Sequence, residues 1–180
     1  MTPGNIILIG YRAVGKSTIG ALVAQRLGRR FVDLDAVLEE EAGESIAALV
    51  ARAGWPEFRR REKELVQRCA GERGLVVATG GGVVLDPDNV AALRGSGLVI
   101  WLQAAPATIQ ARLRGEAQQL AARPGLTSKG TLAEVDEVLA AREPFYKAAA
   151  MATVAADTAS PEVLVQEIIN LVEVWEQRSS

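Results

Sequence analysis

Residues 5–18 read Asn5-Ile6-Ile7-Leu8-Ile9-Gly10-Tyr11-Arg12-Ala13-Val14-Gly15-Lys16-Ser17-Thr18. The first five are an apolar, β-branched run, and residues 10–17 fill the phosphate-binding pattern G-x-x-x-x-G-K-[ST]. The residues that follow, up to Leu27, suit a helix. A strand that passes through a glycine-rich loop into a helix is the setting in which this pattern binds nucleotides. We therefore expect the chain to hold the phosphates of a nucleoside triphosphate.

Each fixed position of the loop has a chemical role. Gly10 and Gly15 can take backbone angles that turn successive N–H groups toward phosphate oxygens. Lys16 can reach the β- and γ-phosphates, and the Ser17 hydroxyl can bind Mg²⁺. The alternative is a chance match in a glycine-rich turn, which the correct flanks disfavour. The expected contacts to ATP come from Ala13, Val14, Gly15, Lys16, Ser17 and Thr18.

Composition narrows the class of protein. The 180 residues suit one domain, 1–180, and with 49% hydrophobic but only 4% aromatic residues its core is expected to consist of aliphatic side chains. A net charge of −2 offers no broad basic field for nucleic acid. No apolar run approaches the roughly 20 residues of a membrane span. The N-terminus enters a strand directly, without room for a signal peptide, so we expect a cytoplasmic protein.

Two residue counts restrict the chemistry further. Cys69 is the only cysteine, which excludes an internal disulfide and suggests a small buried side chain rather than a reactive thiol. The chain has no histidine, so imidazole is excluded both as a general base and as a metal ligand. Carboxylates and hydroxyls remain for a metal, and these ligands suit Mg²⁺ better than Zn²⁺.

Strand and helix patterns alternate along the chain, which predicts an α/β fold with a parallel sheet covered on both faces. The expected strands are Asn5–Ile9, Arg30–Asp33, Leu75–Ala78, Leu98–Leu102 and Ala152–Val154. The expected helices are Lys16–Leu27, Asp35–Ala42, Ser45–Arg52, Glu57–Cys69, Asn89–Arg94, Pro106–Arg114, Leu132–Ala149 and Pro161–Glu176.

Asp33 and Asp35 stand where the second strand is expected to end. Carboxylates two residues apart on an extended segment face the same way, and ligands of parallel sheets bind at this edge. The pair could meet Mg²⁺ and a substrate hydroxyl. Alternatively, Asp35 caps the next helix and Asp33 is solvated. The phosphate-binding loop favours the functional interpretation.

Gly80, Gly81 and Gly82 follow the third expected strand. Three glycines cost chain entropy, so they indicate a ligand that approaches bare backbone; the alternative is a tight turn, which rarely needs three. Arg59 shares a helix face with Glu62, and Arg142 lies in the penultimate helix. Taken singly, each arginine would be interpreted as an exposed surface residue. Together, two guanidinium groups would suit the carboxylate of a small acid.

The segment from Gly115 to Gly130 is polar and broken by Pro124, Gly125 and Gly130. Long exposed stretches in compact domains are usually functional or disordered. The segment, at about 115–130, is therefore either a lid over the active site or a variable surface loop.

Taken together, these motifs resemble the shikimate kinase family, a group of P-loop kinases. The resemblance covers nearly the whole chain. The matching motifs, in order, are Gly15-Lys16-Ser17-Thr18, Asp33/Asp35, Phe58-Arg59-x-x-Glu62, Gly80–Gly82, Arg123-Pro124 and Arg142-x-x-x-Tyr146. Each later motif is weak alone, but five in this order after a phosphate-binding loop are specific.

The resemblance implies a five-stranded sheet in the order 2-3-1-4-5 and transfer of the ATP γ-phosphate to the 3-hydroxyl of shikimate. It implies that Lys16, Asp35 and Arg123 are catalytic, with Arg123 reaching the phosphate from the lid. Asp33 would support Mg²⁺ through water. The implied shikimate-binding region is about 33–61, and the implied shikimate contacts are Asp35, Arg59, Gly80, Gly81, Gly82 and Arg142. We expect a monomer whose partners are ATP and shikimate, without nucleic acid or membrane.

Two departures from the family pattern stand out. Ala13 replaces a glycine common in the loop, which should change loop flexibility without removing a phosphate ligand. The lid reads Arg123-Pro124-Gly125-Leu126 where Arg-Pro-Leu-Leu is usual. Two other functions remain open: a related small-molecule kinase such as a gluconate kinase, and a nucleotide-dependent regulatory protein without an acceptor.

Overall fold

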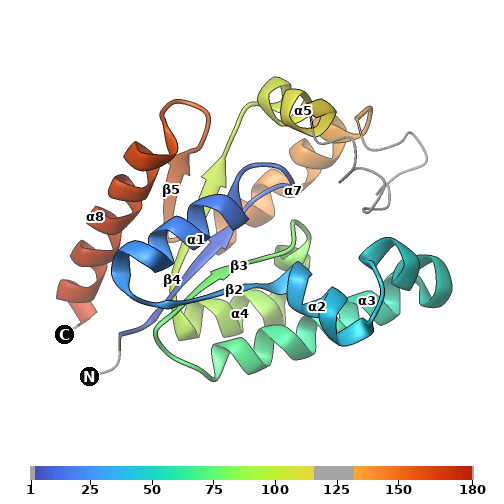
Figure 1. Ribbon diagram of the computed structural model, residues 1–180, viewed down its shortest axis with the longest axis horizontal. Helices are drawn as coiled ribbons and strands as arrows, with labels where there is room; N and C mark the ends of the chain where they lie inside the picture. Colours follow the sequence, from blue (N-terminus) through green and yellow to red (C-terminus); the bar gives the residue numbers. More distant parts are fainter. Residues whose placement is uncertain (1–2, 116–131, 180) are drawn as a thin grey trace.

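The computed structural model describes residues 3–115 and 132–179. Within them, five parallel strands form one sheet in the order β2-β3-β1-β4-β5, as predicted (Figure 1). The strands are β1 Asn5–Ile9, β2 Arg30–Asp33, β3 Leu75–Ala78, β4 Gly97–Gln103 and β5 Ala152–Ala155. Their bounds agree with the predicted strands to within a residue. Most of the predicted lid lies outside the described residues.

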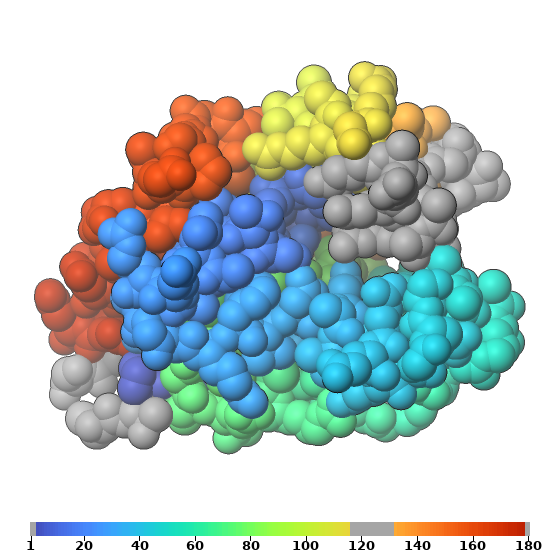
Figure 2. All heavy atoms as spheres, viewed as in Figure 1, coloured from blue at the N-terminus to red at the C-terminus, as the bar shows by residue number. Residues whose placement is uncertain are grey.

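Helices cover both faces of the sheet (Figure 1). The described helices are α1 Lys16–Leu27, α2 Leu34–Ala42, α3 Ile46–Ala70, the 3₁₀ turn η1 Val83–Leu85, α4 Pro87–Ser96, α5 Pro106–Gly115, α7 Val135–Ala149 and α8 Pro161–Ser179. Helices α1 and α8 pack on one face with each other, while α2, α3 and α4 pack on the other. The space-filling view shows α1 in blue, α2 in light blue and α3 in cyan to teal, with α5 in yellow at the top (Figure 2).

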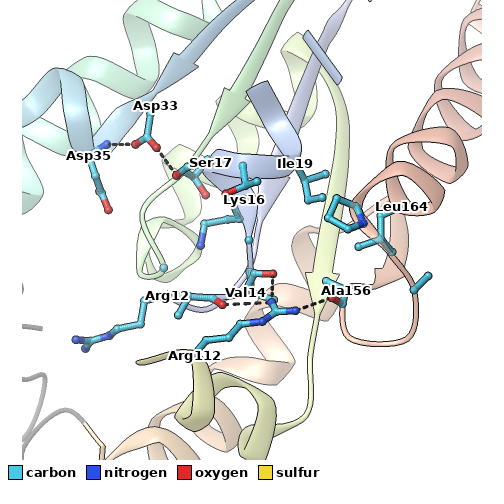
Figure 3. A pocket seen from close by; sticks show the side chains of 17 residues that line it. Arg12, Val14, Lys16, Ser17, Ile19, Asp33, Asp35, Arg112, Ala156 and Leu164 are labelled. Atoms are coloured by element: carbon cyan, nitrogen blue, oxygen red, sulfur yellow. Dashed lines mark hydrogen bonds between the residues drawn. The ribbon is translucent and has the colours of Figure 1, made fainter. Parts of the chain in front are cut away.

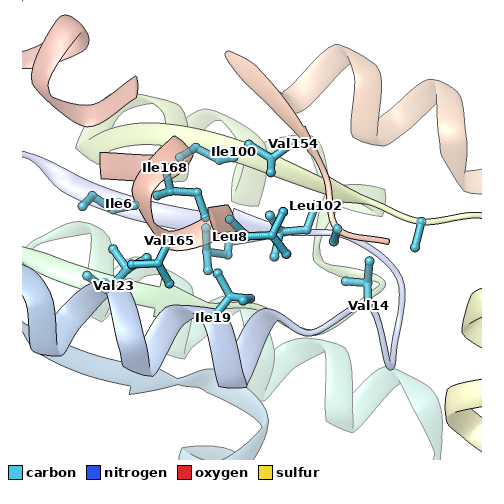
Figure 4. Packing of buried hydrophobic residues seen from close by; sticks show 14 of the residues in the cluster. Ile6, Leu8, Val14, Ile19, Val23, Ile100, Leu102, Val154, Val165 and Ile168 are labelled. Carbon is cyan, nitrogen blue, oxygen red and sulfur yellow. The ribbon is translucent and has the colours of Figure 1, made fainter. Parts of the chain in front are cut away.

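The central strand β1 is buried on both sides. Ile6 and Leu8 point into the cluster that includes α1 and α8 (Figure 4), whereas Ile7 and Ile9 point into the cluster that includes α2, α3 and α4. All four side chains have 0% exposure. Side chains alternate between the faces of a strand, so an unbroken apolar run is what a doubly covered strand requires.

A buried asparagine fixes the start of this strand. The Asn5 side chain donates hydrogen bonds to the carbonyls of Cys69 and Glu72, at 3.2 and 3.0 Å, and accepts one from the Leu75 N–H at 3.0 Å. Because its donors and its acceptor are all satisfied, a buried polar residue is tolerated here. Cys69 is itself buried, which agrees with the prediction that the single cysteine is a small buried side chain.

Several helix boundaries differ from the predictions by one to three residues, among them those of α4 and α8, and three other differences stand out. The two helices predicted at Ser45–Arg52 and Glu57–Cys69 are joined in α3, but Gly54 (φ 81°, ψ 167°) leaves the helical conformation between them. A kink at Gly54 therefore separates two helical stretches, as the prediction of two helices implied. The turn η1 had no signal in the sequence, and α7 begins at Val135 rather than at Leu132.

Replacing Gly54 with alanine is expected to lower the free energy of unfolding by about 1–3 kcal/mol, because its backbone conformation is nearly restricted to glycine. Gly95 in α4 is the matched control, since a Cβ there meets nothing within 4 Å and its φ is not positive. Gly95→Ala should leave stability unchanged or raise it slightly. Urea denaturation of both variants checks this; equal effects would contradict the strain at Gly54.

Candidate active site

A cavity of about 450 Å³ lies at the carboxyl edge of the sheet, around the loop between β1 and α1 (Figure 3). Ligands of open parallel sheets bind at this edge. The predicted nucleotide and metal residues line it together. They are Ala13, Val14, Gly15, Lys16, Ser17, Thr18, Asp33 and Asp35.

The loop has the backbone that its glycines allow. Gly10 and Gly15 have φ values of 144° and 107°, and Gly15 is the N-cap of α1 without a side-chain cap. Ala13 also has a positive φ of 58°, the left-handed region, which costs a non-glycine residue roughly 1–2 kcal/mol. Alanine in place of the glycine common at position 13 therefore adds backbone strain, while the rest of the loop has the conformation that its glycines allow.

Lys16 is buried and stays within the loop. Its Nζ donates hydrogen bonds of 2.8 Å to the carbonyl oxygens of both Gly10 and Tyr11. These contacts hold the ammonium group beside the first turn of α1. A phosphate entering this place meets a positive charge and a helix N-terminus together.

The Ser17 hydroxyl donates a hydrogen bond to the Asp33 carboxylate (Figure 3). The other oxygen of Asp33 accepts from the N–H groups of Asp35 and Ala36, at 3.0 and 3.3 Å. The N-cap of α2 is thus Asp33 and not Asp35. The alternative interpretation, in which Asp35 caps the helix and Asp33 is solvated, is therefore wrong. Asp33 joins the end of β2 to the phosphate-binding loop.

Asp33 and Asp35 do not lie on one extended segment, contrary to the prediction, because the helix begins directly after Asp33. Both residues nevertheless line the cavity, since Asp35 lies in the first turn of α2. Asp35 also lines a second, smaller cavity of about 60 Å³. Asp35 therefore stands on the boundary between the two.

The smaller cavity gathers the residues predicted to bind an acidic substrate. Its walls include Arg59 from α3, Arg142 from α7 and the glycines Gly80–Gly82 that follow β3. It shares Arg12, Asp35 and Gly81 with the larger cavity. At this size it takes only part of an acceptor, and the remainder would extend past Asp35 toward the phosphate-binding loop.

Arg59 is held by three neighbours. Its Nη1 donates to Glu62 Oε2 at 2.6 Å, and its guanidinium carbon lies 5.5 and 5.1 Å from the ring centres of Trp55 and Phe58. Glu62 is almost fully buried, and within the described ranges its Oε1 has no hydrogen-bond partner. Burial raises the pKa of Glu62, while the charge of Arg59 opposes that shift.

Arg142 is buried at 8% exposure, and among the residues that the structure describes it forms no ion pair with a carboxylate. A buried cation without a counter-ion is costly, so this position suits an anionic ligand. One helical turn later, the Tyr146 hydroxyl donates a hydrogen bond to the carbonyl of Gly81. Burial raises the pKa of Tyr146 to about 12, so the hydroxyl keeps its proton and this bond.

The three glycines after β3 allow side chains of the site to approach closely. A Cβ on Gly80 would lie 2.9 Å from Glu62 Oε1 and 3.0 Å from Asp35 Oδ1. A Cβ on Gly82 would overlap the guanidinium of Arg59. None of the three has a positive φ. Close approach, rather than unusual backbone angles, accounts for Gly80 and Gly82, whereas a Cβ on Gly81 would come no nearer than 3.4 Å to another heavy atom.

Arg112 is a site residue that the sequence did not reveal. From α5, its Nη1 donates to the Val14 carbonyl at 2.8 Å and its Nη2 to the Ala156 carbonyl at 3.0 Å (Figure 3). It therefore ties the phosphate-binding loop to the segment after β5, and it lines the larger cavity. Arg114, two residues later, is exposed. Only the tertiary structure distinguishes the two arginines.

Arg123 and the rest of the predicted lid motif lie outside the described residues. Within the part of the chain that the structure describes, no helix combines the length and the apolar character needed to cross a membrane.

A phosphate-binding loop beside a separate acceptor pocket, at the edge of a 2-3-1-4-5 sheet, defines the class: an α/β nucleotide-dependent phosphotransferase. Comparison with known proteins narrows this class. The family model for shikimate kinase matches residues 12–173. The chain belongs to the shikimate kinase family.

Individual relatives agree with this assignment. The shikimate kinase of Symbiobacterium thermophilum is 44% identical over 169 residues, which cover 94% of this chain and 96% of that protein. The solved shikimate kinase of Acinetobacter baumannii in complex with shikimate superimposes with a TM-score of 0.88 at 29% identity, covering 96% of this chain and 94% of that one. A gluconokinase from Sinorhizobium meliloti shares only the fold, with a TM-score of 0.61 at 16% identity over 98% and 95% of the two chains.

Arg112→Met is expected to weaken ATP binding about tenfold, because charge-assisted hydrogen bonds to the loop carbonyls are lost. Calorimetric titration with ATP and Mg²⁺ measures this. Arg114→Met, on the same helix but exposed, is the matched control and should bind as the unaltered chain does. Equal affinities of the two variants would show that Arg112 does not support the loop.

Proposed function

We propose that this chain transfers the γ-phosphoryl group of ATP to the 3-hydroxyl of shikimate, giving shikimate 3-phosphate and ADP in aromatic amino-acid biosynthesis. The observation that carries the proposal is the pair of adjoining cavities that share Asp35. One contains the phosphate-binding loop. The other contains Arg59 and Arg142, which suit the carboxylate of the acceptor.

On the donor side, the loop N–H groups and Lys16 bind the phosphates. Ser17 and Asp33 would hold Mg²⁺, the former directly and the latter through water. Their oxygens fit this ion, which keeps several waters and needs few protein ligands. Among the described residues, no group of three or more possible metal ligands competes with this place. When bound, Mg²⁺ neutralises charge on the phosphates.

On the acceptor side, Asp35 is placed to accept the proton of the attacking hydroxyl at the boundary between the cavities. Gly80, Gly81 and Gly82 supply backbone next to the acceptor. We further propose that Arg123 reaches the moving phosphoryl group from a lid over 115–130, which would exclude water as a competing acceptor. Action as a cytoplasmic monomer, without nucleic acid, stays a prediction from the sequence.

A coupled assay of ADP release tests the function. With ATP, Mg²⁺ and shikimate present, the protein should release ADP continuously. Omission of Mg²⁺ or replacement of shikimate by gluconate should abolish this release. ADP release no faster with shikimate than without it would overturn the proposal. A preference for gluconate would select the related kinase, and binding of ATP without binding of any acceptor would select the regulatory protein.

Arg142→Ala is expected to raise the KM for shikimate about tenfold to a hundredfold and to change the KM for ATP little, because charge-assisted hydrogen bonds to the carboxylate are lost. Lys147→Ala is the matched control, since Lys147 is exposed on the same helix. Steady-state kinetics with each substrate varied in turn provide the measurement. Equal effects on both KM values would contradict the assigned role of Arg142.

A further inference from the structure

Arg12, within the phosphate-binding loop, forms a buried ion pair that the reaction outlined above does not use. Its Nη2 donates to Glu134 Oε1 at 2.9 Å, and the two side chains are 9% and 0% exposed. Its guanidinium carbon also lies 5.6 Å from the centre of the Tyr11 ring. A carboxylate and an aromatic ring thus fix the position of this guanidinium group.

The position lies on the acceptor side of the loop. Arg12 lines the smaller cavity together with Arg59 and Arg142. In Figure 3 its side chain extends away from Lys16 and from Arg112, the two cations on the nucleotide side. Three guanidinium groups, from three different elements, therefore border one small cavity.

Glu134 is placed by the same helix that carries Arg142. It is the N-cap of α7, and its carbonyl accepts from the Val138 N–H at 2.8 Å. Glu134, Val138, Arg142 and Tyr146 follow at intervals of four residues and are all buried, so they share the inner face of α7. This face reaches Arg12 at one end, the acceptor cavity in the middle and Gly81 at the other end.

Stability alone gives little reason for such a pair. Burying two charges carries a desolvation penalty that often equals or exceeds their attraction, and apolar residues of similar volume commonly serve as well. The pair does, however, hold a donor with fixed geometry against a ligand cavity. Fixed donors bind a ligand with less loss of side-chain entropy.

We propose that Arg12 is a further acceptor-binding residue and that Glu134 is its positioning residue. Arg12 donates to the carboxylate of the acceptor from the side of the phosphate-binding loop, while Arg59 and Arg142 approach from α3 and α7. This inference rests on the proposed function and deepens it, because it adds a recognition element that belongs to the donor loop.

The first test is kinetic. Arg12→Met should raise the KM for shikimate about tenfold and change the KM for ATP much less, because a charge-assisted hydrogen bond to the acceptor is lost. The second test uses an analogue in which a hydroxymethyl group replaces the carboxylate. This replacement should raise KM less in Arg12→Met than in the unaltered chain. An equal penalty in both would overturn the contact between Arg12 and the carboxylate.

A double-mutant cycle tests Glu134. Glu134→Gln should raise the KM for shikimate in the unaltered chain but not in the Arg12→Met background, because Glu134 acts on shikimate binding by positioning Arg12. Additive effects would overturn the positioning role. If Arg12→Met does not fold because the buried Glu134 has lost its ion pair with Arg12, Arg12→Met/Glu134→Gln removes that charge and is compared with Glu134→Gln using both acceptors.

Arg29→Met is the matched control, because Arg29 forms a similar ion pair with Glu176 at 2.6 Å, away from both cavities. It should lower stability without a selective effect on shikimate. An Arg12→Met variant that behaves as Arg29→Met does would overturn the inference while leaving the proposed function intact. An unaltered chain that releases no ADP with shikimate would overturn the proposed function, and this inference with it.

Discussion

The burial of β1 on both faces is the constraint on which the rest of the structure depends. Ile6 to Ile9 are fully enclosed, so this strand must lie in the middle of the sheet with helices on either side. Its neighbours run parallel to it, and their carboxyl ends therefore meet at one edge. The phosphate-binding loop follows β1, Asp33 ends β2 and Gly80–Gly82 follow β3. The strand topology alone therefore brings these three segments of the site to one edge of the sheet.

Helix α7 adds the second half of the site by presenting one continuous inner face. A hydrogen bond from Tyr146 fixes the glycine segment, and the pair between Glu134 and Arg12 joins the helix to the donor loop. Glu62 holds Arg59 on the opposite wall in the same manner. Buried glutamates thus set the geometry of two arginines, whereas Arg142 stands between them without such a partner among the described residues.

The local patterns of the chain predicted the strands, most helices and the phosphate-binding loop, because apolar runs, caps and glycines act within a few residues. The strand order came from the resemblance to a family, since periodicity does not specify which strands are neighbours. Arg112 and Arg114 could not be told apart, because burial of one depends on contacts more than 40 residues away in the chain. The steric reason for Gly80 and Gly82 could not be predicted either, because it depends on Asp35, Glu62 and Arg59, which are distant in the sequence.

The burial of Arg142, which has no carboxylate partner among the described residues, has a consequence for inhibitors. A neutral molecule that fills the acceptor cavity would expel water yet leave the guanidinium group without a counter-ion, at a cost in desolvation of a few kcal/mol. An acidic molecule avoids that cost, but its charge hinders passage across a lipid bilayer. Potency and entry into the cell thus place opposite demands on the same chemical group. A carboxylate masked as an ester until it is inside the cell would meet both demands.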